Sequence, residues 1–152
     1  MEHGLLGNNT MVQVGVIVRD IDKAAADYAE FFGIDKPQAR LTDSHDKTLA
    51  EYRGSPTRAR AKLAFMDFGS LQVELIEPNE QPSTWREFLD RHGEGIHHLA
   101  FVVDGMKEKV ATLAGKGFAL QQKGEYTGGR YAYVDTTDTL KTIIELLEND
   151  RS

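Results

Sequence analysis

A chain of 152 residues, 40% of them hydrophobic and 28% charged, is long enough for one globular domain with a substantial buried core. Its formal net charge of −6 argues against a nucleic-acid partner, because phosphate backbones are bound by basic surfaces. The sequence has neither an apolar run that could span a bilayer nor a signal-peptide pattern at its start. We therefore expect a cytoplasmic protein with no membrane partner.

The chain contains no cysteine, which excludes disulfide bonds and thiolate metal sites. Any metal ion bound here must be held by carboxylate or amide oxygens and by imidazole nitrogens. The placement of these groups along the strands is therefore the main evidence on function.

The first half begins with a polar lead-in at residues 1–10 and a β-rich run at 11–18. Valines alternate along this run and place Gln13 on the opposite face. Asp20 is typical of a helix N-cap and Gly33 of a helix stop, which predicts a helix at about 22–32. The elements expected next are a substrate-side loop or hairpin at 35–60 with one strand near 47–53, and strands at 61–68 and 71–77.

The second half repeats this order after a connector at 79–95, in which Pro82-Ser83 begins a short amphipathic helix. The pattern is βαβββ twice, although the two halves share little sequence. We predict an α+β fold of two modules within one domain, residues 11–78 and 96–148, with a tail at 149–152. The elements expected in the second module are a strand at 96–103, a helix at about 105–115, and strands near 118–122, 130–135 and 141–148.

Side-chain alternation assigns one polar residue in each of four strands to the same side of the sheet. These residues are Gln13, Glu74, His98 and Glu145, whereas His97 falls with the core-facing set. Two curved half-sheets facing each other would bring the four within chelating distance. Taken singly, each carboxylate is more typical of a solvated strand face, and a lone buried histidine is more typical of a hydrogen-bonded core residue. Their recurrence at matching places in both halves favours a metal site.

Four segments resemble the methylmalonyl-CoA epimerase branch of the vicinal oxygen chelate superfamily: Val73–Pro78, His92–Phe101, Tyr126–Arg130 and Ile143–Leu146. The resemblance covers about residues 11–148. It implies paired βαβββ modules that form an open, cupped mixed sheet around one divalent metal ion, and a homodimer as the assembly. In this superfamily the ligands come from the first and last strand of each module, which correspond here to Gln13, Glu74, His98 and Glu145.

The chain departs from this branch at several positions. Many of its epimerases begin the ligand series with histidine, whereas a series that begins with Gln13 is similar to that of some glyoxalase I enzymes. Those enzymes hold glutathione partly through an arginine and an asparagine, and Ile17 and Pro78 stand at these places. Some bacterial epimerases also carry a second catalytic glutamate on the strand before Glu74, and Lys62–Met66 has no carboxylate there.

A centre of three oxygens and one imidazole nitrogen suits Zn, Ni, Co, Mn or Mg, with positions left for substrate. Such a metal ion acts as a Lewis acid that stabilises an enediolate. A nearby carboxylate then removes the proton beside the carbonyl. Glu145 is the first candidate for this base, because the matching ligand of glyoxalase-like relatives leaves the metal to take the proton. Glu74 is the alternative.

The expected substrate is a small anionic molecule. Arg58 and Arg60 could clamp its phosphate or carboxylate, although alternating basic residues are also typical of an exposed strand face. Tyr126 and Arg130, from the matching segment, complete the expected substrate-binding set.

Several function classes follow. The first is a metal-dependent lyase or isomerase, similar to methylmalonyl-CoA epimerase, that acts through an enediolate on an α-hydroxy-carbonyl or an acyl thioester. The alternatives are a glyoxalase I-like lyase and a non-catalytic small-molecule-binding module of the same fold. An extradiol dioxygenase is less favoured, because Gln13 replaces the first of the two histidines that its iron site uses.

Overall fold

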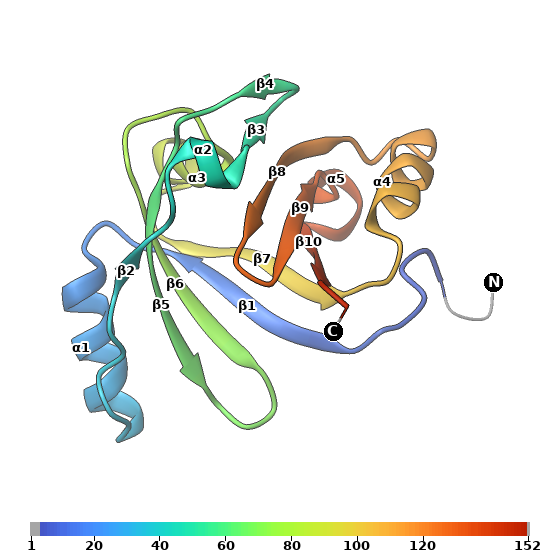
Figure 1. The fold of residues 1–152 in the computed structure, drawn as a ribbon. Coiled ribbons are helices and arrows are strands. Elements are labelled where there is room, and N and C mark those ends of the chain that lie inside the picture. Colours follow the sequence, from blue (N-terminus) through green and yellow to red (C-terminus); the bar gives the residue numbers. More distant parts are fainter. Residues whose placement is uncertain (1–3, 152) are drawn as a thin grey trace.

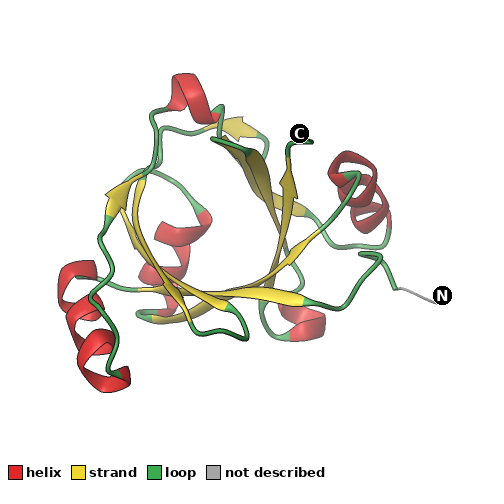
Figure 2. Ribbon diagram, turned by 60° about the horizontal axis from the view of Figure 1, so that its bottom comes forward, coloured by secondary structure: helices red, strands yellow, loops and turns green. Residues whose placement is uncertain are grey.

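A single ten-stranded mixed sheet curls into a cup in the computed structural model, which describes residues 4–151 (Figures 1 and 2). The strand order is β2-β5-β6-β1-β7-β10-β9-β8-β3-β4. The predicted α+β class with an open, cupped mixed sheet is therefore confirmed. Residues 1–3 of the expected lead-in and residue 152 of the expected tail lie outside the described residues.

The strands are β1 (Met11–Ile17), β2 (Arg40–Leu41), β3 (Glu51–Tyr52), β4 (Ser55–Pro56), β5 (Ala61–Asp67), β6 (Gln72–Pro78), β7 (Gly95–Val102), β8 (Leu120–Tyr126), β9 (Gly129–Val134) and β10 (Ile143–Asn149). The helices are α1 (Ile21–Phe32), α2 (His45–Thr48), α3 (Thr84–His92), α4 (Met106–Gly115) and α5 (Thr137–Leu140). None of the helices described combines the length and the hydropathy of a membrane-spanning segment.

The two halves of the sheet mirror each other. The order β2-β5-β6-β1 on one side is matched by β8-β9-β10-β7 on the other. The first and last strands of each half run parallel, β1 beside β6 and β7 beside β10, and antiparallel β1 and β7 join the halves. The four strands that were expected to carry ligands are therefore consecutive in the middle of the sheet.

The irregular segment before β5 differs from its expected single strand near 47–53. It forms β2 at one edge of the sheet, then helix α2, then a short β3–β4 hairpin that pairs with β8 at the other edge. Arg53 and Gly54 both adopt positive φ at the hairpin turn. Two consecutive residues in this conformation form the tight turn that joins two antiparallel strands. The segment thus crosses from one edge of the cup to the other.

Three helices support the sheet. Helix α1 begins where the side chain of Asp20 accepts a hydrogen bond from the Lys23 amide, and it ends at Gly33 in a left-handed conformation. Helix α1 packs on β5 and β6, and α4 packs on β9 and β10, so both lie outside the cup (Figure 2). Helix α3 instead closes one end of the cup, where Trp85 and Leu89 are buried.

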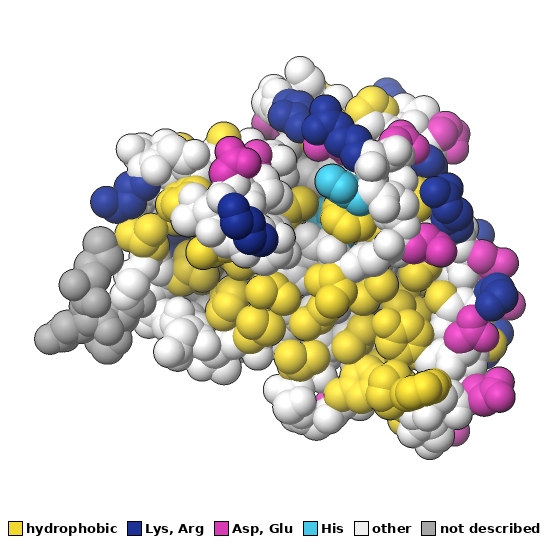
Figure 3. Space-filling view, turned by 180° about the vertical axis from the view of Figure 1, so that it is seen from behind, with side chains coloured by type: hydrophobic (Ala, Val, Ile, Leu, Met, Phe, Trp, Pro, Cys, Tyr) yellow, Lys and Arg dark blue, Asp and Glu magenta, His cyan; other side chains and the backbone are white. Residues whose placement is uncertain are grey.

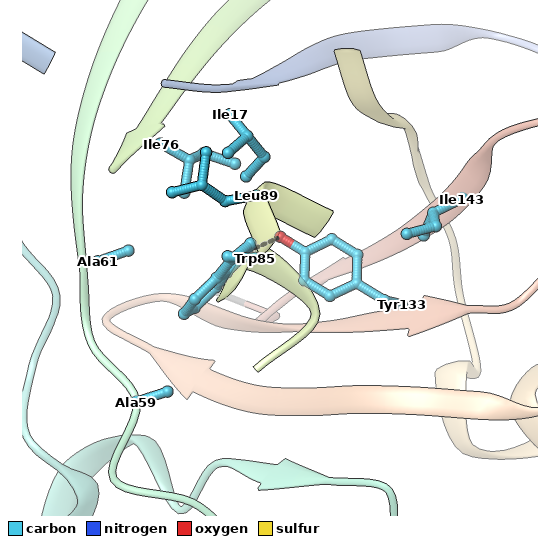
Figure 4. Packing of buried hydrophobic residues seen from close by; sticks show 8 residues of the cluster. All are labelled: Ile17, Ala59, Ala61, Ile76, Trp85, Leu89, Tyr133 and Ile143. Atoms are coloured by element: carbon cyan, nitrogen blue, oxygen red, sulfur yellow. Dashed lines mark hydrogen bonds between the residues drawn. The ribbon is translucent and has the colours of Figure 1, made fainter. Parts of the chain in front are cut away.

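The cluster around α3 joins both modules (Figure 4). Trp85 belongs to one buried cluster with Ile17 and Ile76 of the first module and Tyr133 of the second. The Trp85 indole Nε1–H donates a hydrogen bond of 3.0 Å to the Tyr133 hydroxyl. This contact fixes the position of the aromatic wall that borders the cavity described below.

Candidate metal centre

Four polar side chains from the central strands meet at the floor of the cup. The Nε2 atom of His98 lies 2.9 Å from Oε1 of Gln13, 3.2 Å from Oε1 of Glu145 and 3.6 Å from Oε1 of Glu74. The two carboxylates and the imidazole each offer one ligand atom, and these atoms lie within 4.8 Å of one another. The structure therefore brings together the four residues that were selected from strand alternation.

The environment of these groups fits a cation. All four side chains are buried, and Oε1 of Glu74 and of Glu145 have no hydrogen-bond partner among the described residues. Two buried carboxylates without donors are costly unless a positive charge neutralises them. Oxygen and imidazole donors are ligands that divalent cations accept.

Gln13 is oriented by its neighbour on β6. Its Nε2 atom donates a hydrogen bond of 2.6 Å to Oε1 of Gln72. The amide oxygen of Gln13 is therefore the end that faces His98 and the carboxylates, which is the orientation that a metal ligand requires.

The clustered charges shift the pKa values of the site. Burial and the adjacent Glu145 raise the pKa of Glu74 to about 8, although His98 partly opposes this. Burial opposes protonation of His98, but the carboxylates of Glu145 and Glu74 outweigh it and raise the pKa of this imidazole. Without a cation the cluster therefore retains a proton near neutral pH, and a cation must displace that proton on binding.

Gly15 makes room for His98, a role that was not predicted from the sequence. Gly15 lies directly opposite His98 in the β1–β7 ladder, and a Cβ at this position would overlap the imidazole ring. A glycine within a strand often marks the close approach of another group, and this signal was available in the sequence.

His97 does not lie where strict alternation predicts. It was expected on the core-facing side of β7, but its ring contacts Phe88 of α3 and Tyr133 of β9, with centroids at 5.4 and 5.1 Å. The β1–β7 register shifts here, because Gly15 pairs with His98 and Val16 pairs with Ile96. A bulge interrupts alternation, so the two adjacent histidines lie against the same ring of Tyr133.

A cavity of about 610 Å³ lies above the centre, bordered by Gln13, Glu74 and Glu145. Its walls are mainly apolar and aromatic. The hydrophobic and aromatic residues of these walls are Leu41, Ala50, Ala59, Leu63, Phe65, Trp85, Tyr126, Tyr131, Tyr133 and Leu147. A cavity of this size and character suits a small organic ligand.

The expected substrate-binding residues have different positions. Tyr126 lines the cavity, whereas Arg58, Arg60 and Arg130 are not among its lining residues. Arg58 is exposed, the guanidinium of Arg60 donates to the carbonyl oxygen of Thr42, and Arg130 pairs with Glu148 at 3.0 Å. A role for any of the four in substrate binding stays a prediction.

Arg40 was not selected from the sequence, yet it borders the cavity from β2. It is the only basic residue among the described residues that line the cavity. No pattern in the sequence predicts this position, because it depends on the pairing of β2 with β5 at the edge of the sheet.

Comparison with known proteins agrees with this architecture. The chain is 27% identical over 143 residues to an uncharacterized protein, YqjC, of Bacillus subtilis (strain 168), and the match covers 92% of each chain. The structure is similar to methylmalonyl-CoA epimerase from Mycobacterium tuberculosis, with a TM-score of 0.59, 23% identity and coverage of 97% of this chain and 91% of that one. A Streptomyces coelicolor methylmalonyl-CoA epimerase variant in complex with 2-nitronate-propionyl-CoA gives a TM-score of 0.61 at 18% identity, covering 94% and 99%.

At these identities the solved structures show a shared fold. The sequence itself matches the Glyoxalase/Bleomycin resistance protein/Dioxygenase superfamily over residues 12–134, which is most of the chain. This match confirms the superfamily to which the sequence segments pointed. The chain belongs to the glyoxalase/bleomycin resistance protein/dioxygenase superfamily.

Proposed function

We propose that this protein is a divalent-metal-dependent lyase or isomerase that removes a proton beside a carbonyl group. The proposed substrate is a small anionic α-hydroxy-carbonyl compound or acyl thioester, and the proposed reaction is similar to that of methylmalonyl-CoA epimerase. The observation that carries the proposal is the pair of buried carboxylate oxygens, on Glu74 and Glu145, that lack donors beside His98 at the floor of a cavity.

The four residues at the floor would hold the ion: Gln13, Glu74, His98 and Glu145. When bound, a divalent cation polarises a substrate oxygen and stabilises the negative charge that develops beside it. Glu145 is the proposed base, because its Oε1 has no donor among the described residues and it borders the cavity. Glu74 borders the same space and is the alternative base.

The aromatic wall keeps water from the reacting carbon and holds the substrate in one orientation. The hydroxyl of Tyr133 is fixed by Trp85, and the hydroxyl of Tyr131 accepts a hydrogen bond of 2.9 Å from Nε2 of Gln122. Rings held in this way need no rearrangement when substrate enters, and an apolar wall strengthens the electrostatic interactions within the site.

A glyoxalase I-like activity is the second candidate, and the ligand series favours it. The residues at the two glutathione-holding places oppose it. Ile17 is fully buried in the α3 cluster, and Pro78 is buried and has no polar side chain. We therefore expect the glutathione hemithioacetal of methylglyoxal to be a poor substrate, and its efficient turnover would make the glyoxalase assignment the better one.

Metal analysis and isotope exchange test the proposal together. Protein purified without chelator should contain one equivalent of a divalent metal, and deuterium from solvent should enter the α-carbon of methylmalonyl-CoA. Glu145→Gln should abolish the exchange, whereas Glu30→Gln, an exposed glutamate on α1, should leave it unchanged. A protein without metal and without exchange would instead support a non-catalytic binding module, and exchange retained in Glu145→Gln would transfer the base to Glu74.

The proposed assembly is a homodimer that pairs the convex face of the central strands. Val14 lies between Val73 and Leu99 in the register of β6, β1 and β7, and all three are only partly buried. They point away from the metal centre, whose residues occupy the alternate positions. Helices α1 and α4 pack on β5, β6, β9 and β10, so the convex face is least covered over β1 and β7 between them.

A further inference from the structure

We propose that His97 is a positioning residue for the metal centre: its Nδ1 accepts the Nδ1–H of His98 and so keeps Nε2 of His98 free to bind a cation. The inference rests on the metal centre in the proposed function. It concerns how the chain fixes one of the four ligands, and it assigns a function to the histidine that alternation had placed elsewhere.

The rings of His97 and His98 are in direct contact. The Nδ1 atoms of His97 and His98 are 2.9 Å apart, which is a hydrogen-bond distance. A neutral imidazole has one N–H and one lone pair, and a hydrogen bond between two such nitrogens needs a proton on one of them only. One ring therefore donates and the other accepts.

The neighbours of His98 identify which of the two rings donates. The other nitrogen of His98, Nε2, faces the oxygens of Gln13, Glu145 and Glu74. A cation held by these groups requires a lone pair on Nε2, so the proton of a neutral His98 must reside on Nδ1. His98 is then the donor and His97 accepts through Nδ1. The proton of His97 resides on Nε2, which is buried and has no hydrogen-bond partner among the described residues.

His97 is an uncharged acceptor for His98. Ligating histidines commonly donate their second N–H to a carboxylate or a carbonyl oxygen, which orients the ring. Here the acceptor is a neutral imidazole instead. Glu74 and Glu145 together already balance a divalent cation, so an uncharged acceptor orients His98 without adding a third negative charge to a buried site.

The surroundings hold both rings in place. His97 is 1% exposed, and Phe88 and Tyr133 meet its ring at steep angles of 77° and 89°. On the opposite side, His98 lies over Gly15, where a larger residue would displace it. These contacts hold the two rings against each other.

Zn²⁺ binding and ¹⁵N NMR test this assignment on the full-length protein. In the zinc-loaded wild type, the spectrum should show His98 protonated at Nδ1 and His97 protonated at Nε2. His97→Leu removes the acceptor and should weaken Zn²⁺ affinity by roughly 10- to 100-fold, which is the usual effect of losing such a partner. His97→Asn places an amide oxygen near the position of Nδ1 and should recover most of the affinity.

The possible outcomes separate this inference from the proposed function. If the wild type binds no divalent metal, the metal centre itself is wrong. If it binds Zn²⁺ but His97→Leu binds equally well, or His98 carries no proton on Nδ1, only the role of His97 is wrong. If His97→Leu does not fold, the tautomers of the wild type and the affinity of His97→Asn still decide the question.

Discussion

At the scale of single residues, the centre depends on side chains that are not ligands. Gly15→Ala introduces a Cβ that overlaps the ring of His98, and the β-ladder holds the backbone in place. We expect this variant to lose about 1–3 kcal/mol of unfolding free energy through overpacking. Its Zn²⁺ affinity should fall as well, because His98 is displaced; urea unfolding and zinc titration measure the two effects.

Gly115→Ala is the matched control. Gly115 ends α4, and nothing lies within 4 Å of the position that its Cβ would occupy. The same substitution there should leave Zn²⁺ affinity unchanged and alter stability by no more than about 1 kcal/mol, in the favourable direction. Equal Zn²⁺ affinity of Gly15→Ala and the wild type would contradict the prediction, because it would mean that His98 still binds the metal ion with a Cβ at position 15.

The pH dependence of the metal-free protein is a second residue-scale prediction. The pKa of Glu74 is raised from its ordinary value of 4.5 to about 8, so the folded state binds more protons than the unfolded state between these values. Stability contributed by this protonation is complete below about pH 4.5 and is lost as pH rises toward 8. The raised pKa of His98 acts in the same direction.

Urea midpoints at pH 5, 6.5 and 8 measure this effect. The stability that the centre contributes to the metal-free protein should decrease from pH 5 to pH 8. Glu74→Gln should make this decrease smaller. Bound Zn²⁺ should oppose this loss of stability at high pH, because metal affinity increases as the ligands lose their protons. A wild type and a Glu74→Gln variant with parallel pH profiles would mean that Glu74 is already ionised in the metal-free fold.

The single basic residue of the cavity wall gives a third prediction. We expect Arg40→Ala to weaken binding of an anionic acyl thioester by roughly 10- to 100-fold, the value of a lost charge-assisted hydrogen bond of about 1.5–3 kcal/mol. Because Arg40 is exposed at the edge strand β2, its removal should not reduce stability or Zn²⁺ affinity. Arg58→Ala is the control, because it removes a basic residue outside the cavity lining. If Arg40 binds the anionic group of the substrate, KM should increase in Arg40→Ala and not in Arg58→Ala. An equal increase in both variants would indicate a general effect of charge.

At the scale of elements, the sequence predicted whatever depends on regular alternation and local caps. The alternation of β6 and β10 placed Glu74 and Glu145 on the concave face, and Asp20 and Gly33 marked the ends of α1. His97 departed from the alternation, because a bulge is a property of the paired strands and of their register.

The segment before β5 could not be predicted from the sequence for the same reason, since its structure depends on strand pairing. Its short strands pair with β5 and β8, which are distant from it in the sequence, so β2 and the β3–β4 hairpin gain their stability from tertiary contacts. Two residues per strand carry too little pattern for a prediction from sequence. Arg40 was missed for this reason.

Helix α3 is the element whose loss should affect both modules. Trp85 is 5% exposed and contacts residues of each module, so Trp85→Ala should cost about 3–5 kcal/mol. Hydrogen exchange should then accelerate in α3. Arg86→Ala, on the same helix, removes only an exposed ion pair with Asp90 and should cost no more than about 1 kcal/mol. If the two variants unfold at the same urea concentration, α3 does not join the modules energetically.

At the scale of the whole molecule, the cup presents two unlike faces. The concave face holds the polar centre, and Figure 3 shows a broad gathering of hydrophobic side chains on the face of the molecule seen from behind. Apolar areas that no helix covers are typical of interfaces between proteins. An isologous pairing of two copies is the commonest way in which soluble proteins cover such a face.

The proposed homodimer predicts a mass of twice the chain by light scattering at micromolar concentration. Val14→Asp places a charge in the centre of the apolar row with Val73 and Leu99, and it should shift the protein toward monomers. Leu49→Asp, at a residue that is 58% exposed on the segment crossing the cup, adds the same charge elsewhere and should leave the dimer intact. Because the metal ligands lie on the other side of the sheet, monomeric Val14→Asp should still bind Zn²⁺. A wild type that scatters as a single chain would count against the dimer, and loss of Zn²⁺ binding on dissociation would mean that the centre needs the second copy.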